Sequence, residues 1–189
     1  MELIKNSLFT SPYLKAYYQF EDNANDSKNG HNGTASNVNY LTGKYGKAGS
    51  FNGSNSAITI SDHNDLKPTG AFSVGCWVKT TQNAAGIRVF NSGNWSGAGL
   101  SGIELQIISG KPAIYSADGT GTTENVDYKI VTSSIGVNDD NWHLIIGTWD
   151  GSKLNIYVDL NAPNSVDWNK SAGYLSPNFE TIGRRTTSS

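Results

Sequence analysis

The stretch over residues 141–159, NWHLIIGTWDGSKLNIYVD, constrains the fold more than any other part of the sequence. Runs of alternating residues flank Asp150 and Gly151, and this arrangement is the strongest short-range sequence signal for a β-hairpin. The first run is apolar on both faces, which indicates a strand within a sheet that is packed on two sides. The second run alternates cleanly, so one face is expected to be buried: Leu154, Ile156, Val158 and Leu160.

Similar short runs, separated by turn signals, fill the rest of the chain. Strands are predicted over residues 14–21, 46–52, 56–61, 72–80, 86–91, 103–108, 112–116, 126–132 and 174–183, with a long polar loop over residues 22–40 and further loops over 92–102 and 161–172. Short strands at this spacing, with no confident helix, predict an all-β, two-sheet antiparallel β-sandwich. The expected division is a lead-in over residues 1–13 and one sandwich domain over 14–189.

Composition and charge exclude several classes of protein. The 189 residues include 9 Tyr and 5 Trp, and only 16% are charged, which argues against disorder. A net charge of −2 argues against nucleic-acid binding, which requires clustered Lys and Arg residues. No apolar run approaches the roughly 18 residues of a membrane span. The start of the sequence shows no signal-peptide pattern, yet we expect an extracellular or virion-surface location. The single cysteine, Cys76, is predicted to be a buried apolar residue in a strand.

Four segments in order resemble the concanavalin A-like lectin/glucanase superfamily, specifically its laminin-G-like jelly rolls. They are LKAYYQFEDNANDSKNGHNGTAS, GKYGKAGSFNG, FSVGCWVKT and NWHLIIGTWDGSKLNIYVD with TIG downstream, and together they span residues 14–183. The resemblance implies a jelly-roll sandwich.

One departure from this family concerns the closing strand, which usually pairs beside the opening strand and has no counterpart before Ser189. We therefore expect the edge of residues 14–21 to be open, or covered by residues 2–9. An open edge would allow self-association or assembly through pairing with another chain.

Catalysis of the retaining-glucanase type, which occurs in this superfamily, requires two carboxyl groups about 5 Å apart. Glu104 lies in the predicted central strand GIELQI, but its same-face neighbour is Gln106. No second acid is present there, and the three histidines are scattered along the sequence, so the sequence predicts a protein that is not an enzyme.

A calcium site is predicted in the loop over residues 22–40. Asp22, Asn25, Asp26 and Asn29 offer hard oxygen ligands of the kind that Ca²⁺ prefers. Laminin-G-like relatives often bind calcium near this loop, and Asp26 is the best positional match. The alternative is a solvated turn in which these side chains cap their own backbone.

Aromatic residues near the predicted loops suggest a glycan-binding face. Trp95 and Trp168 lie in polar segments, and Tyr115 and Tyr128 flank the loop over residues 117–125. Exposed aromatic rings beside polar groups are typical of binding surfaces. Alternatively, each Trp folds back over the edge of the sandwich.

Two functional hypotheses follow. The first is a non-catalytic carbohydrate-binding or adhesion module that recognises surface glycans. The second is a structural or assembly domain of a bacteriophage tail or virion, or of a bacterial surface protein. A third class, glycoside hydrolases, would need the acid pair that this sequence lacks.

Overall fold

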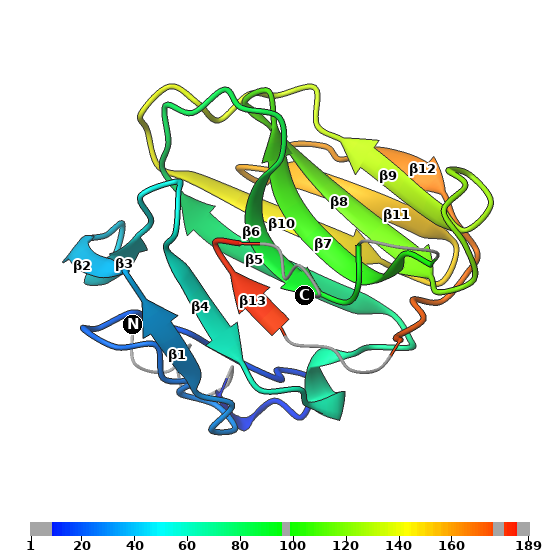
Figure 1. The fold of residues 1–189 in the computed structure, drawn as a ribbon. Helices are drawn as coiled ribbons and strands as arrows, with labels where there is room; N and C mark the ends of the chain where they lie inside the picture. Colours follow the sequence, from blue (N-terminus) through cyan, green and yellow to red (C-terminus); the bar gives the residue numbers. More distant parts are fainter. Residues whose placement is uncertain (1–8, 96–98, 176–179, 185–189) are drawn as a thin grey trace.

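Two antiparallel sheets lie face to face in the computed structural model, which describes residues 9–95, 99–175 and 180–184 (Figure 1). The larger sheet has seven strands in the order β1-β4-β13-β6-β7-β8-β9, and the smaller has four in the order β12-β11-β10-β5. A separate two-stranded ribbon is formed by β2 and β3. This arrangement confirms the predicted all-β sandwich.

The elements have the following bounds: β1 Gly33–Ser36, β2 Asn39–Thr42, β3 Lys47–Ser50, β4 Ala57–Ile60, the 3₁₀ helix η1 Asn64–Leu66, β5 Phe72–Val78, β6 Ile87–Ser92, β7 Ser101–Ile108, β8 Lys111–Asp118, β9 Tyr128–Thr132, β10 His143–Trp149, β11 Lys153–Val158, β12 Asn164–Asp167 and β13 Glu180–Ile182. Three of them correct the sequence prediction, because β1 lies within the predicted loop 22–40, β2 begins within it, and β12 lies within the predicted loop 161–172. No described helix is long and apolar enough to cross a bilayer.

The predicted hairpin is formed by β10 and β11, which pair from Ile145 with Val158 to Trp149 with Leu154. Asp150 closes the turn, since its Oδ1 accepts hydrogen bonds from the backbone N–H groups of Ser152 (2.8 Å) and Lys153 (2.7 Å). Leu154, Ile156 and Val158 are buried as predicted. The prediction that Leu160 is buried is wrong, because this residue is 75% exposed. Positive φ angles at Asp159 and Leu160 turn the chain away after β11.

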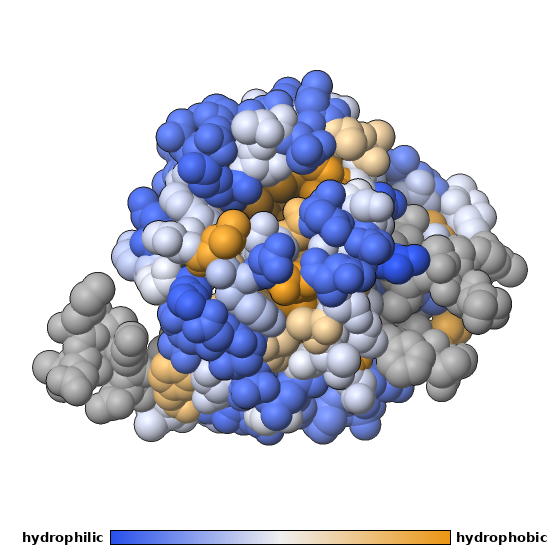
Figure 2. Space-filling view, turned by 60° about the vertical axis from the view of Figure 1, so that its left-hand side comes forward, coloured by the Kyte–Doolittle hydropathy of each residue, from blue (hydrophilic) through white to orange (hydrophobic). Residues whose placement is uncertain are grey.

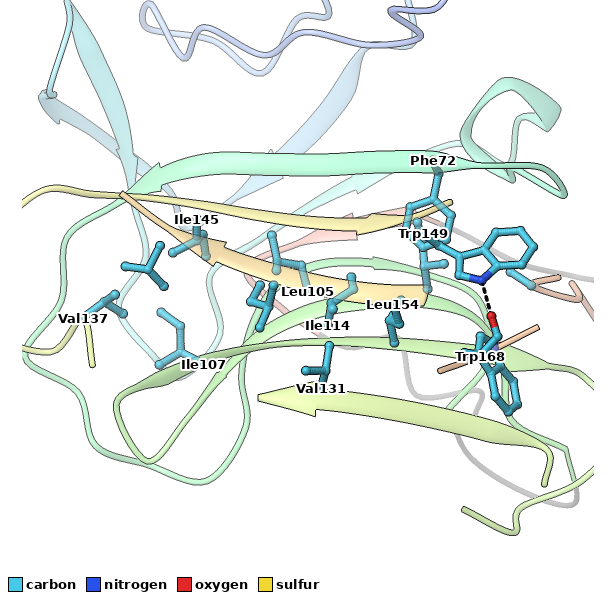
Figure 3. Close-up of a cluster of buried hydrophobic side chains, with 14 residues drawn as sticks. Phe72, Leu105, Ile107, Ile114, Val131, Val137, Ile145, Trp149, Leu154 and Trp168 are labelled. Carbon is cyan, nitrogen blue, oxygen red and sulfur yellow. Dashed lines mark hydrogen bonds between the residues drawn. The ribbon is translucent and has the colours of Figure 1, made fainter. Parts of the chain in front are cut away.

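The main hydrophobic core fills the space between the two sheets (Figure 3). Leu105 and Ile114 come from the larger sheet, and Ile145 and Leu154 from the smaller one. Gly147 on β10 faces Ile114, and a Cβ atom placed there would lie 2.8 Å from the Cδ1 atom of Ile114. The absence of a side chain at Gly147 therefore makes room for Ile114.

Cys76 lies on β5 and packs against this main core, but it is half-buried rather than fully buried as predicted. Desolvation by burial raises the pKa of its thiol to about 12.

A second, smaller hydrophobic cluster packs the N-terminal segment against the larger sheet. Its buried residues are Ala24, Ile58, Ile60 and Leu66. Ala16, Tyr18 and Phe20 pack against it, so the alternation in residues 14–21 predicts the correct inward-facing side chains.

The prediction of a strand over residues 14–21 is nevertheless wrong. Tyr18 makes only an isolated antiparallel bridge to Asp26, and a positive φ at Phe20 and at Asp22 reverses the chain. The larger sheet ends instead at β1 and β9, so the predicted open edge at residues 14–21 is not a sheet edge. The segment that was expected to cover this edge, residues 2–9, lies outside the described residues except for Phe9.

Candidate functional site

Four polar side chains gather on the face of the larger sheet that points away from the main core. We call Arg88, Asn91, Glu104 and Gln106 the polar row. The strand register pairs Asn91 with Glu104 and Arg88 with Gln106 across β6 and β7. Their strand neighbours Phe90, Leu105 and Ile107 belong to or pack against the main core, so the polar row faces the other way.

Burial and charge make this row unusual for an outward sheet face. Asn91, Glu104 and Gln106 are buried, and Glu104 is 0% exposed. The Arg88 Nε atom lies 3.4 Å from the Glu104 Oε1 atom, which pairs the buried carboxylate with a guanidinium. A buried carboxylate requires such compensation, because the charge loses its hydration.

Three aromatic rings lie next to the polar row, and we call Trp95, Tyr115 and Tyr128 the aromatic row. Tyr115 is the register partner of Glu104 across β7 and β8. The rings of Trp95 and Tyr115 are nearly perpendicular with centroids 5.5 Å apart, and those of Tyr115 and Tyr128 are stacked with centroids 6.4 Å apart. Three of the four aromatic residues predicted from sequence are therefore brought together.

Accessibility falls along this aromatic row. Tyr115 and Tyr128 are half-buried, whereas Trp95 is 5% exposed. Burial raises the pKa of Tyr128 and the nearby charge of Glu124 adds to the effect, so its hydroxyl stays protonated at neutral pH. The accessible end of the row is formed by the two tyrosines.

Trp168 lies elsewhere, at one end of the main core (Figure 3). The indole Nε1–H of Trp149 donates a hydrogen bond of 2.7 Å to the Trp168 carbonyl oxygen. Trp168 is 5% exposed, so neither it nor Trp95 presents the open ring that its polar surroundings suggested. Both follow the alternative in which the Trp folds back, and any contact with a ligand stays a prediction.

The residues predicted to bind calcium are engaged with the protein itself. The Asp26 carboxylate is buried and accepts four backbone N–H bonds, from Tyr17 (2.7 Å), Lys28 (2.9 Å), Asn29 (3.0 Å) and His31 (3.1 Å). Asp22 pairs with the Lys47 ammonium at 2.5 Å.

Asn29 is turned toward the backbone as well, since its Nδ2 donates to the Lys15 carbonyl oxygen at 2.9 Å. Each Asp26 oxygen already holds two donors, so a cation there would have to displace backbone N–H groups. This arrangement does not fit a calcium ion at Asp26, and calcium binding by the loop stays a prediction.

The alternation in GIELQI predicts that Glu104 and Gln106 share one face, but no sequence pattern predicts that Arg88 and Asn91 lie beside them. The reason is a β-bulge in β6 between Arg88 and Phe90, which shifts the register against β7. The bulge puts Arg88 and Asn91, three positions apart, on the same face, which a period of two does not predict. Alternating polar residues in GIELQI were the available signal.

A further exposed aromatic pair lies beside the smaller sheet. Tyr45 and Trp77 make an edge-to-face contact with centroids 5.8 Å apart, and the Lys44 ammonium lies 5.0 Å from the centre of the Trp77 ring. On the side of the molecule turned forward in Figure 2, hydrophobic residues lie in hollows between hydrophilic ones. The pair offers a second aromatic surface against which the aromatic row can be compared.

The sequence and the fold are both similar to those of known proteins. A laminin-G-like family model, described as the concanavalin A-like lectin/glucanases superfamily, matches residues 52–188. No curated protein matches the sequence. Domain 4 of AbnA, a GH43 extracellular arabinanase from Geobacillus stearothermophilus solved in complex with arabinotriose, has a TM-score of 0.67 at 18% identity, covering 90% of this chain and 82% of that one.

Two neurotoxin structures are similar over most of this chain. The binding domain of botulinum neurotoxin serotype C1 has a TM-score of 0.61 at 13% identity, covering 89% of this chain and 42% of that one. The binding domain of botulinum neurotoxin DC in complex with SialylT has a TM-score of 0.58 at 13% identity, covering 93% and 44%. This chain thus spans less than half of either toxin chain, and at such identities the likeness concerns the fold alone.

Proposed function

The chain belongs to the concanavalin A-like lectin/glucanase superfamily, and from this premise we propose that it is a non-catalytic carbohydrate-binding module. The observation that carries the proposal is the stacked pair Tyr115 and Tyr128 beside the polar row on the outer face of the larger sheet. A sugar ring offers an apolar face for an aromatic ring and hydroxyls for the guanidinium of Arg88, whose side chain is 25% exposed.

The absence of a catalytic role is part of the proposal. Glu104 has Gln106 as its neighbour on the same face of β7, where a retaining glycosidase would need a second carboxylate. The Glu104 carboxyl group is instead paired with the Arg88 guanidinium. The alternative of an assembly domain rests on sequence alone and stays a prediction.

The experiment is a binding screen with a panel that includes arabino-oligosaccharides and sialylated glycans, followed by titration of any hit. Tyr128→Ala should weaken binding about tenfold or more, equivalent to roughly 1.4 kcal/mol, because it removes one ring of the stacked pair at the accessible end of the aromatic row. Trp77→Ala is the matched control, since it removes an exposed aromatic ring from the other sheet.

The outcomes separate the module from its site. Binding that survives Trp77→Ala but not Tyr128→Ala supports both. Loss with Trp77→Ala alone keeps the carbohydrate-binding module but moves its site to the smaller sheet. No saturable binding to any glycan of the panel at millimolar concentration overturns the proposed function.

A further inference from the structure

Three side chains with metal-binding atoms converge next to η1. His31 comes from the segment before β1, and His63 and Asp65 come from η1 and the residue that caps it. The His31 Nε2 atom lies 3.2 Å from the Asp65 Oδ2 atom, and the His63 Nδ1 atom lies 3.9 Å from that same oxygen. One ligand atom from each residue can be chosen so that all lie within 4.8 Å of one another.

The position of His31 is fixed by its backbone. Its N–H donates to the Asp26 Oδ2 atom at 3.1 Å, and its carbonyl oxygen accepts from the Tyr18 hydroxyl at 2.6 Å. The His31 side chain is 8% exposed. The Asp26 carboxylate therefore fixes the backbone that carries the His31 imidazole.

His63 and Asp65 are positioned by η1. His63 caps this helix, with its Nδ1 accepting the Asp65 N–H at 3.3 Å, and buried Leu66 anchors the turn in the second cluster. The same Nδ1 atom lies 3.9 Å from the Asp65 Oδ2 atom, so an ion bound between them would replace this capping hydrogen bond. The rings of His31 and His63 lie with centroids only 3.9 Å apart and planes inclined by 43°, so the two imidazoles are in direct contact.

Two imidazoles and one carboxylate are a ligand set for Zn²⁺ and neighbouring divalent transition metals, whereas Ca²⁺ prefers oxygen alone. Ligand atoms around tetrahedral zinc lie roughly 3.3 Å apart, so the group needs to contract modestly. His63 can supply this movement because its side chain is 49% exposed. A pocket of about 210 Å³, lined by Gly30, Asn32, Ile60 and Ser61 besides the two histidines, leaves room for a fourth ligand.

We propose that His31, His63 and Asp65 bind one divalent transition metal ion, of which Zn²⁺ suits the ligands best. The ion ties the segment before β1 to the connection between β4 and β5, two parts of the chain that also meet in the second hydrophobic cluster. This site is separate from the aromatic and polar rows and does not depend on glycan binding.

The test is calorimetric titration of untagged, chelator-treated protein with Zn²⁺, Co²⁺ and Ca²⁺. We expect one Zn²⁺ per chain with a micromolar or tighter Kd, absorption bands of tetrahedral Co²⁺, and no competition from Ca²⁺ for the Zn²⁺ site. His63→Ala and Asp65→Asn change exposed side chains and should each weaken Zn²⁺ binding about tenfold or more. Thermal unfolding of each variant without metal shows whether it is folded.

The matched control is His143→Gln, which removes the third histidine. Both ring nitrogens of His143 are already engaged, with Asp159 at 2.7 Å and Asp139 at 2.9 Å, so Zn²⁺ affinity should not change. The proposal is overturned if wild-type protein shows no saturable stoichiometric Zn²⁺ binding, or if folded His63→Ala binds Zn²⁺ as tightly as wild type does.

Discussion

At the scale of single residues, Gly147 shows how one sheet limits the sequence of the other. It lies between Val74 and Ile156 in the register of the smaller sheet, with Ile114 of β8 packed over it. A period-two pattern predicts that this position faces inward, as it predicted Leu154 and Ile156. It does not predict that glycine is required, because that depends on a side chain of the opposite sheet.

We therefore expect Gly147→Ala to lower the free energy of unfolding by about 1–3 kcal/mol. The new methyl group would lie within 2.9 Å of the Ile114 Cβ atom, which is fixed to the backbone and cannot rotate away. Urea unfolding followed by tryptophan fluorescence measures the effect.

Gly70→Ala is the control, since a Cβ atom there meets nothing within 4 Å. Its unfolding free energy should stay within about 0.5 kcal/mol of wild type. Equal stability of Gly147→Ala and Gly70→Ala would show that Ile114 can repack at no cost.

At the scale of elements, the segment over residues 14–36 shows where local pattern fails. Alternation predicts the side chains that pack inward, Ala16, Tyr18 and Phe20, but not the path of the chain. The Asp26 carboxylate gathers backbone N–H groups on both sides of the turn and replaces the ladder that a strand would have formed. A side chain that competes for backbone donors can override strand propensity.

Asp26→Asn should lower the unfolding free energy by about 2–3 kcal/mol near neutral pH, because it substitutes an NH₂ donor for an oxygen that accepts charge-assisted hydrogen bonds. Burial alone would raise the pKa of Asp26, but the four backbone N–H groups outweigh it and lower the pKa. Its stabilising effect is thus complete above the unfolded pKa of about 3.9 and disappears as the pH falls through the lower folded value.

Urea unfolding across pH 2–8 checks this. The stability difference between wild type and Asp26→Asn should be constant above about pH 5 and shrink in acid. Asn25→Ala changes an exposed neighbour and should be nearly neutral throughout. A difference that does not vary with pH would mean that the charge of Asp26 contributes nothing.

At the scale of the whole molecule, the sandwich could be predicted because its main core is built from strands with regular alternation. The family match over residues 52–188 covers the strands of that core. The burial of Trp95 and Trp168 could not be predicted, since a loop that folds back is decided by tertiary packing. The metal-binding group escaped prediction for a similar reason: His31 and His63 are far apart in sequence and meet only because η1 packs beside the segment before β1.

The separation of the β2–β3 ribbon from the two sheets predicts unequal local stability within the molecule. The ribbon of β2 and β3 lies outside both sheets, and two strands alone are marginally stable. Amides of β2 and β3 should therefore exchange with solvent more than about a hundredfold faster than those of β10 and β11, as measured by hydrogen exchange.

Strands β1 and β4 provide the internal comparison, because they pair within the larger sheet and contact the second cluster. Their amides should exchange at rates between those of the ribbon and those of the central hairpin. Equal protection of β2–β3 and β10–β11 would mean that the molecule opens only as one cooperative unit.

The burial of Cys76 against the core has a practical consequence. The chain carries no other cysteine, and a thiol with a pKa of about 12 is almost wholly protonated at neutral pH. Maleimide reagents should therefore label it much more slowly than an exposed thiol in the native protein. A cysteine engineered at a solvent-facing position would then be the faster-reacting group, so a dye or spin label could be attached to the unaltered background at a chosen point.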